Sequence, residues 1–370
     1  MGTITQRKRA NGDVAYTSQI RLKRGGVVIH SEAQTFDRKT DATAWMKRRE
    51  TELAAPGAIA ALSKPDPKLG DVIDQYLTES DTVKKVGRTK KATLKAIAKM
   101  ALGELKCSEV DSGQLVAFAR KRITVDGAKP PTVLNDLALL TGVFAIAEPA
   151  WGFPLSTQEM DKAKAVCRQL GYIERADERT RVPTVAEMSK LIPHFLDASR
   201  RRPWVCPMFK IVPFALFSTR RMEEITHLRW DDINKEDKTI IVRDAKHPRK
   251  KIGNHLTASI PDEAWAIIES MPKVSDRIFP FTTDAIEAQF RRATDWLDIE
   301  DLHFHDLRRG GVTRLFEMGK GIPEVASVSL HKDWNMLRRY TNIKKMGDRY
   351  KGWEWLKPAI ERKWMPKPEK

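Results

Sequence analysis

Residues 217–225 read Phe-Ser-Thr-Arg-Arg-Met-Glu-Glu-Ile, an apolar run that meets two arginines and then two glutamates. A helical pattern begins again near Arg221. On such a helix Arg221 and Glu224 are separated by three residues, so the carboxylate can orient the guanidinium. An isolated pair of this kind is common on protein surfaces, and its meaning therefore depends on the rest of the chain.

Four further elements follow this stretch in a fixed order. They are Lys246 in a basic loop after the β-branched segment 240–243, the box His305-Asp306-Leu307-Arg308, the pair Leu330-His331, and Tyr340 nine residues after His331. His305 and Arg308 are three residues apart, which places an imidazole beside a guanidinium on one helix face.

These side chains suit the transfer of a phosphodiester to a phenol. The transition state of that reaction carries extra negative charge on a pentacoordinate phosphorus. A guanidinium stays protonated and can bind two nonbridging oxygens at once, so Arg221 and Arg308 fit this charge. The leaving alkoxide requires a general acid. A phosphotyrosyl bond conserves the energy of the cleaved bond, so the reaction requires no ATP.

In the order and spacing of all five elements, the sequence resembles the tyrosine recombinases, or phage integrases, over about residues 180–345. The resemblance implies a nucleophile, two phosphate-binding guanidiniums and a supporting carboxylate, at Tyr340, Arg221, Arg308 and Glu224. It also implies an imidazole that accepts a proton or binds the phosphate, a second imidazole that donates to the phosphate, and a lysine general acid, at His305, His331 and Lys246.

Some of these positions have neighbours of the same type. The competitors are Arg220 for Arg221, Lys250 or Lys251 for Lys246, and Tyr350 for Tyr340. The offset to Glu224 favours Arg221 over Arg220, and Tyr350 lies at the wrong distance from His331.

Three positions depart from the family pattern without removing a catalytic side chain. Thr219 and Leu330 stand where glycine is usual, and Arg309 stands where histidine is common. We expect these departures to tune the activity.

Length and composition favour a nucleic-acid-binding protein of several domains and argue against a secreted or membrane protein. The chain has 370 residues, and 66 Lys and Arg against 49 Asp and Glu give a formal net charge of +17. That length predicts two or three domains, and the basic excess favours a nucleic-acid partner. The N-terminus lacks the apolar core of a signal peptide, no run of about 18 apolar residues predicts a spanning helix, and three scattered cysteines favour a reducing compartment. No metal motif or Walker A loop occurs, so we expect no metal and no cofactor.

The N-terminal residues predict a three-stranded sheet followed by a helix. Residues 14–22 alternate apolar and polar side chains, which is typical of a strand. A basic sheet of this size can enter a DNA major groove. The candidate DNA contacts are Arg7, Lys8, Arg9, Arg21, Lys23 and Arg24.

The segment from Leu69 to about Glu174 shows helical periodicity throughout, with helices expected over 89–102 and 131–147. Residues 82–100 contain seven basic residues and no acid, and such an unbalanced run repels itself unless it meets phosphates. The candidate contacts there are Lys84, Lys85, Arg88, Lys90, Lys91 and Lys95.

The predicted fold is multidomain α+β. In it, residues 1–55 form an arm-site DNA-binding domain, a sheet plus helix, and residues 56–68 form a linker. Residues 69–175 form an all-α, SAM-like core-binding domain, and residues 176–345 form a mainly helical catalytic domain with a small antiparallel sheet. The C-terminal tail, residues 346–370, either exchanges between subunits or packs on its own domain.

The resemblance implies a site-specific recombinase that integrates or excises a phage or another mobile element through 3′-phosphotyrosyl intermediates. Its expected partners are core-type and arm-type duplex DNA, three further copies of the chain in a tetramer, a host DNA-bending protein and an excisionase. The expected location is the nucleoid of a bacterial cytoplasm, with no membrane association. Two alternatives are a non-catalytic DNA-binding accessory protein on the same scaffold and a relaxing type IB-like topoisomerase.

Overall fold

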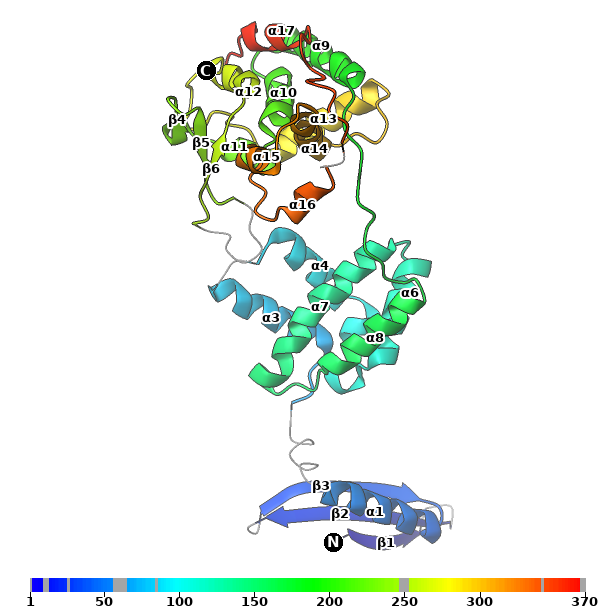
Figure 1. Ribbon diagram of the computed structural model, residues 1–370. Coiled ribbons are helices and arrows are strands. Elements are labelled where there is room, and N and C mark those ends of the chain that lie inside the picture. The colour runs from blue at the N-terminus through cyan, green and yellow to red at the C-terminus, as the bar shows by residue number, and fades with distance from the viewer. Residues whose placement is uncertain are drawn as a thin grey trace. The chain divides into compact units, whose positions relative to one another are not determined.

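The computed structural model describes residues 2–8, 13–24, 27–55, 65–83, 86–245, 253–340 and 343–366 (Figure 1). The chain divides into two compact units, Met1–Glu178 and Arg179–Lys370, and each is described by itself. The predicted fold class is confirmed, because helices predominate and two small antiparallel sheets accompany them.

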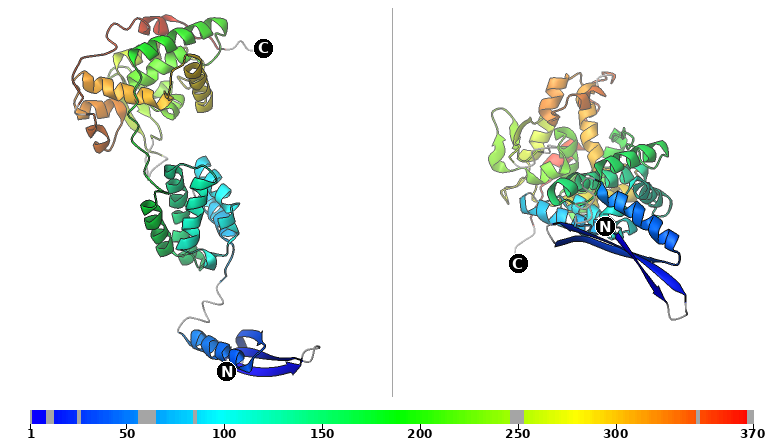
Figure 2. Two further views of the ribbon diagram at one scale, coloured as in Figure 1. Left: turned by 90° about the vertical axis from the view of Figure 1, so that its right-hand side faces the viewer. Right: turned by 90° about the horizontal axis from the view of Figure 1, so that it is seen from below.

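The first unit begins with the antiparallel strands β1 (Gly2–Lys8), β2 (Val14–Arg24) and β3 (Val27–Phe36), in the order β1-β2-β3. Helix α1 (Lys39–Ala54) lies along one face of this sheet (Figure 2). The Ser18 hydroxyl donates to the Ala42 carbonyl at 2.8 Å, and Ile20 is fully buried. Even-numbered residues of β2 therefore face the helix, and odd-numbered residues face away.

The rest of this unit is a helical bundle. It comprises α3 (Leu69–Val83), α4 (Arg88–Ala98), α5 (Ala101–Glu104), the 3-10 turn η1 (Cys107–Glu109), α6 (Ser112–Thr124), α7 (Pro130–Trp151) and α8 (Thr157–Gln169). The continuous helix expected over 89–102 is wrong, because the chain turns between α4 and α5. A Cβ on Gly103 would lie 2.0 Å from the Ala98 carbonyl oxygen, so this turn is tightly closed.

Helix α7 has the length and hydropathy of a membrane span, although the sequence contains no long uninterrupted apolar run. Its buried side chains, such as Leu137 and Phe144, belong to the core of the bundle. It also buries Asp136, whose carboxylate accepts a hydrogen bond from Arg122 at 3.1 Å. These contacts are those of a core helix in a bundle.

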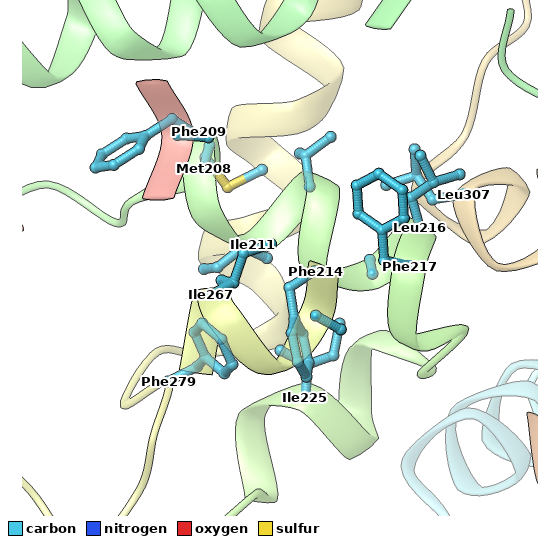
Figure 3. Close-up of a cluster of buried hydrophobic side chains, with 14 of the residues drawn as sticks. Met208, Phe209, Ile211, Phe214, Leu216, Phe217, Ile225, Ile267, Phe279 and Leu307 are labelled. Atoms are coloured by element: carbon cyan, nitrogen blue, oxygen red, sulfur yellow. The ribbon is translucent and has the colours of Figure 1, made fainter. Parts of the chain in front are cut away.

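The second unit is built around α10 (Met208–Ser218), all of whose residues are buried. Helices α9 (Val185–Arg201), α12 (Asp262–Glu269), α14 (Phe304–Glu317) and α17 (Leu356–Glu361) contact it. Figure 3 shows its side chains within this core, where the rings of Phe214 and Phe279 lie 4.8 Å apart. The remaining elements are α11 (Met222–His227), η2 (Trp230–Asp232), α13 (Thr283–Trp296), α15 (Ile322–Ser329), α16 (Asn335–Arg338) and an antiparallel sheet of β4 (Ile233–Asn234), β5 (Thr239–Val242) and β6 (Leu256–Ser259).

Helices α10 and α14 approach each other closely at Gly311. A Cβ there would lie 2.0 Å from the Leu216 carbonyl oxygen, and main chain cannot move aside cheaply. We expect Gly311→Ala to lower the free energy of unfolding by about 3 kcal/mol. The matched control is Gly142→Ala in α7, where the new Cβ would meet only the Tyr76 hydroxyl at 3.6 Å. That change is expected to stabilise the protein by about 0.5–1 kcal/mol. Thermal and denaturant unfolding measure both, and equal stabilities would contradict the close packing.

The C-terminal segment packs on its own chain. The Trp353 indole donates to the Ser189 hydroxyl at 2.9 Å, and the Trp364 indole donates to the Val205 carbonyl at 3.0 Å. The fully buried Lys210 ammonium donates to the carbonyls of Ala359 and Ile360 at the end of α17. Exchange of this segment between subunits stays a prediction.

Candidate active site

A cavity of about 610 Å³ in the second unit brings together five of the six predicted catalytic side chains. It is lined by Arg221, His305, Arg308, His331 and Tyr340. These residues come from α11, α14 and the segment after α15, which are distant in sequence. The cavity also includes Arg309, Lys332 and Arg339, so its walls are strongly cationic.

Arg221 reaches the cavity because the chain changes direction after α10. Thr219 ends that helix with φ of 56°, in the left-handed region, and Arg221 is the N-cap of α11. The Arg221 Nη1 donates to Glu224 Oε1 at 2.6 Å, and its main-chain N–H donates to Oε2 at 3.1 Å. Burial alone would raise the pKa of Glu224, but the guanidiniums of Arg220, Arg308 and Arg221 lower it. Glu224 is therefore a fixed anion that orients Arg221.

Arg308 is buried, and main-chain carbonyls hold its guanidinium. Nη1 donates to the Thr219 carbonyl at 2.6 Å, and Nη2 donates to the Ser329 carbonyl at 2.8 Å. Burial, together with the charges of Arg221 and Arg220, lowers the pKa of Arg308 to about 9. The group is still protonated at neutral pH, and a bound anion would relieve the repulsion among these cations.

The two histidines approach the cavity from different elements. His305 lies in the first turn of α14, and desolvation followed by the charges of Arg308 and Arg221 lowers its pKa. His331 follows Leu330, which ends α15 with φ of 56°. The Ser329 hydroxyl lies 2.7 Å from His331 Nδ1. Burial and then Arg308 lower the pKa of His331 to about 3, so its ring is neutral at physiological pH.

His303, two residues before His305, plays a different part. It is the N-cap of α14, its side chain is 63% exposed, and it lines a smaller, adjoining cavity of about 260 Å³ that also includes Arg221, His305 and Arg308. The helix start beneath it is anchored by the buried Asp306, which accepts three hydrogen bonds of 2.8–3.1 Å from Arg179. This anchor fixes the turn that carries His305.

Tyr340 lies just beyond α16, and apolar packing holds its ring. Leu337 in that helix is fully buried, and the Tyr340 ring stacks on Phe316 with centroids 5.9 Å apart and planes 7° apart. The Arg339 guanidinium lies 5.7 Å from the Tyr340 ring centroid. The competitor Tyr350 is buried in the core, and burial raises the pKa of its phenol. Tyr340 is thus the tyrosine that lines the cationic cavity.

Lys246 and its competitors Lys250 and Lys251 lie outside the described residues. The base of their loop is described. Asn254 donates from its side chain to the Ala245 carbonyl at 2.6 Å and accepts from Lys332 Nζ at 2.7 Å. Because Lys332 follows His331 and lines the cavity, the described residue Asn254 lies beside the site.

The cavity residues that were not predicted from the sequence include two cations, Lys332 and Arg339. Each is adjacent to a predicted site residue, Lys332 to His331 and Arg339 to Tyr340. The one feature of the sequence that could have indicated them is that they lie next to predicted site residues. Lysine and arginine are too common in this basic chain for that position alone to distinguish site residues from other surface cations.

The N-terminal sheet presents an open face opposite α1. The side chains that strand alternation and pairing place there include no acid; they are Thr3, Thr5, Arg7, Ala15, Thr17, Gln19, Arg21, Lys23, Val28, Ser31, Ala33 and Thr35. Of the predicted contacts, Arg7, Arg21 and Lys23 lie on this face, Lys8 alternates toward the other face, and Arg24 is the last residue of β2. Arg9 lies outside the described residues.

Of the basic residues of α4, two bind neighbouring side chains and two are exposed. Lys90 donates to the Tyr76 hydroxyl and Lys91 to Asp81, both at 2.5 Å. Arg88 and Lys95 are exposed on the helix. Lys84 and Lys85 lie outside the part of the chain that the structure describes.

Known proteins resemble this chain in sequence and in fold. Residues 189–346 match the family model described as the phage integrase family. A shufflon-specific DNA recombinase of Escherichia coli is 30% identical over 215 residues, which are 58% of this chain and 51% of that relative. The chain thus spans about half the length of this relative. A putative integrase/recombinase of Haemophilus influenzae is 25% identical over 295 residues, covering 79% of this chain and 90% of the relative.

Solved structures show the same fold at low sequence identity. A lambda integrase dimer bound to a COC′ core site superposes with a TM-score of 0.59 at 16% identity, covering 91% of this chain and 94% of that one. A lambda integrase tetramer bound to a Holliday junction gives 0.58 at 18% identity, covering 89% and 95%. Residues 189–346 therefore match the phage integrase family, the tyrosine recombinases, and the chain shares the fold of solved integrases.

Proposed function

We propose that this protein is a site-specific recombinase that cleaves and rejoins duplex DNA through a 3′-phosphotyrosyl bond to Tyr340. One observation carries the proposal: the five predicted side chains Arg221, Arg308, His305, His331 and Tyr340 line the same cavity. A DNA-binding accessory protein has no need of this set.

In the proposed reaction the Tyr340 oxygen attacks the scissile phosphorus and the 5′ oxygen of the next nucleotide leaves. Arg221 and Arg308 bind the nonbridging oxygens, where negative charge develops. His305 accepts the phenolic proton or binds the phosphate, and neutral His331 donates a hydrogen bond to it. Lys246 protonates the departing 5′ oxygen. The reverse reaction, with a 5′ hydroxyl from another duplex, completes strand exchange and regenerates the phenol.

The assembly on DNA follows from the same proposal. The helical domain binds core-type sites and the N-terminal sheet binds arm-type sites, with four chains on two duplexes. Lambda integrase bound to a core site and, as a tetramer, to a Holliday junction supports this arrangement by likeness of fold. A host DNA-bending protein and an excisionase complete the proposed partners, and the bacterial nucleoid is the proposed location. The proposed outcome is integration or excision of a phage or another mobile element.

The proposal is tested with a pool of duplexes whose central sequence is randomised and in which each strand is nicked near the centre. Cleavage close to a nick releases a short oligonucleotide and traps the protein on DNA. We expect an adduct that survives denaturing electrophoresis and whose recovered DNA shares a sequence. The absence of an adduct would contradict the proposal. Relaxation of a supercoiled plasmid without exchange between two plasmids would instead support a topoisomerase.

The open face of the N-terminal sheet gives a separate prediction. Replacing Arg7 and Arg21 with alanine is expected to weaken binding to a random-sequence duplex and to lower the slope of log Kd against log salt by about 2. The control pair, Lys47→Ala and Arg48→Ala, removes the same charge from exposed positions of α1 on the other side of the sheet. Equal losses from both pairs would show that this face does not contact DNA.

A further inference from the structure

Arg220 does not line the cavity that contains Tyr340; it lines the adjoining cavity of about 260 Å³, which shares Arg221, His305 and Arg308 with it. Its side chain is 0% exposed. Nη2 donates to the carbonyl of Val328, and Nε donates to the carbonyl of Ser218 at 3.2 Å. These bonds join the turn before Arg221 to the turn before His331. We propose that Arg220 is a positioning residue that fixes these two turns against each other and so places His331 for the reaction proposed above, on which this inference rests.

Both turns require such support because of their backbone conformation. Thr219 and Leu330 each have φ of 56°, in the left-handed region, where a side chain costs about 1–2 kcal/mol and glycine costs little. Unfavourable conformations of this kind persist where the surrounding contacts hold them. The Thr219 hydroxyl adds one weak contact, to the Val328 carbonyl at 3.5 Å. Arg220 provides the charged hydrogen bond to the same carbonyl.

Arg308 bridges the same two turns but has a second task. Its guanidinium donates to the carbonyls of Thr219 and Ser329 and also lines the cavity where the phosphate would bind. Arg220 bridges the turns from a fully buried position, and it does not line the cavity that contains Tyr340. With Arg220 removed, Arg308 and the weak Thr219 contact would be left to join the two turns, and His331 would be held less firmly.

The charge of Arg220 also acts on the site. Its Nη1 lies 3.6 Å from Glu224 Oε2 and has no hydrogen-bond partner among the described residues. Glu224 meanwhile bonds Arg221 at 2.6 Å. Three guanidiniums therefore surround one carboxylate, and the excess positive charge favours an anion in the adjacent cavity.

The test compares Arg220→Met and Arg220→Lys in the full-length chain, each with and without Leu330→Gly. Adduct formation on the nicked duplex gives the rate, and a binding titration gives Kd. We expect Arg220→Met to slow adduct formation by roughly 10- to 100-fold, the scale of a small misplacement of reacting groups, with Kd changed less than about threefold. Leu330→Gly should restore at least about fivefold in that background, because glycine adopts the left-handed turn unaided. Arg220→Lys should fall between Arg220→Met and the wild type.

Each outcome of these measurements supports or overturns the positioning role of Arg220. A wild-type rate for Arg220→Met, or a slow rate that Leu330→Gly does not improve, overturns the positioning role. If Arg220→Met fails to fold in a thermal melt, Arg220→Lys carries the same test, because it keeps the charge but not the planar fork. If the wild-type chain forms no adduct, both the proposed function and the positioning role of Arg220 are wrong. If the wild type and Arg220→Met form the adduct at equal rates, the positioning role of Arg220 is wrong and the proposed function stands.

Discussion

Replacing Tyr340 with phenylalanine is expected to abolish the covalent adduct with nicked DNA while leaving the affinity for the same duplex within about twofold. The change removes one oxygen, the atom that would attack the phosphorus, and keeps the ring that stacks on Phe316. Folding and DNA binding should therefore be retained. Denaturing electrophoresis measures the adduct, and a filter-binding titration measures the affinity.

Tyr350→Phe is the matched control. It also removes one phenolic oxygen, but from a buried ring whose hydroxyl has no hydrogen-bond partner among the described residues. Removing a buried, unpaired hydroxyl should leave stability unchanged or slightly raised. We expect full adduct formation from this variant. Loss of the adduct in Tyr350→Phe together with its retention in Tyr340→Phe would reverse the assignment of the nucleophile.

Arg308→Lys is expected to slow adduct formation by about 10²- to 10³-fold, the usual effect of removing one donor that stabilises a transition state. A lysine keeps the positive charge but cannot reach two carbonyls and a phosphate with one planar group. The buried carbonyls of Thr219 and Ser329 would lose donors, so the free energy of unfolding should also fall, by about 1–3 kcal/mol.

The control for Arg308→Lys is Arg291→Lys, an 80% exposed position on α13. It makes the same chemical change away from the cavity and should leave both rate and stability unchanged. Rates measured with enzyme in excess over DNA separate the chemical step from binding. A rate for Arg308→Lys within threefold of the wild type would contradict the role of Arg308 at the phosphate.

The spacing of the sequence predicted much of the site. His305 and Arg308 are one helical turn apart, so the pattern of one helix was enough to place them together. The sequence also favoured Tyr340 over Tyr350 as the nucleophile, through the distance from His331, and that assignment stays a prediction. In the structure Tyr340 lines the cavity, whereas Tyr350 is buried in the core. The three-stranded sheet with its helix was predicted as well, because strand alternation is visible in residues 14–22.

Other features could not be predicted, because they depend on contacts between residues that no periodic pattern in the sequence connects. The break between α4 and α5 arises where Gly103 packs against the Ala98 carbonyl. The bond from Arg220 to the Val328 carbonyl joins residues 108 positions apart. The offset to Glu224 favoured Arg221 over Arg220 for the cavity, but the burial of Arg220 and its bond to Val328 could not be predicted from the sequence. The left-handed conformations of Thr219 and Leu330 are likewise held by tertiary contacts.

The central claim is that the Tyr340 oxygen becomes bonded to the 3′ end of cleaved DNA. The most direct test is to digest the denatured adduct with protease and nuclease and to sequence the modified peptide by tandem mass spectrometry. The account predicts a nucleotide phosphate on Tyr340, attached through the 3′ end of the DNA. A nucleotide on Tyr350 or on any other residue, or attachment through a 5′ end, would contradict it.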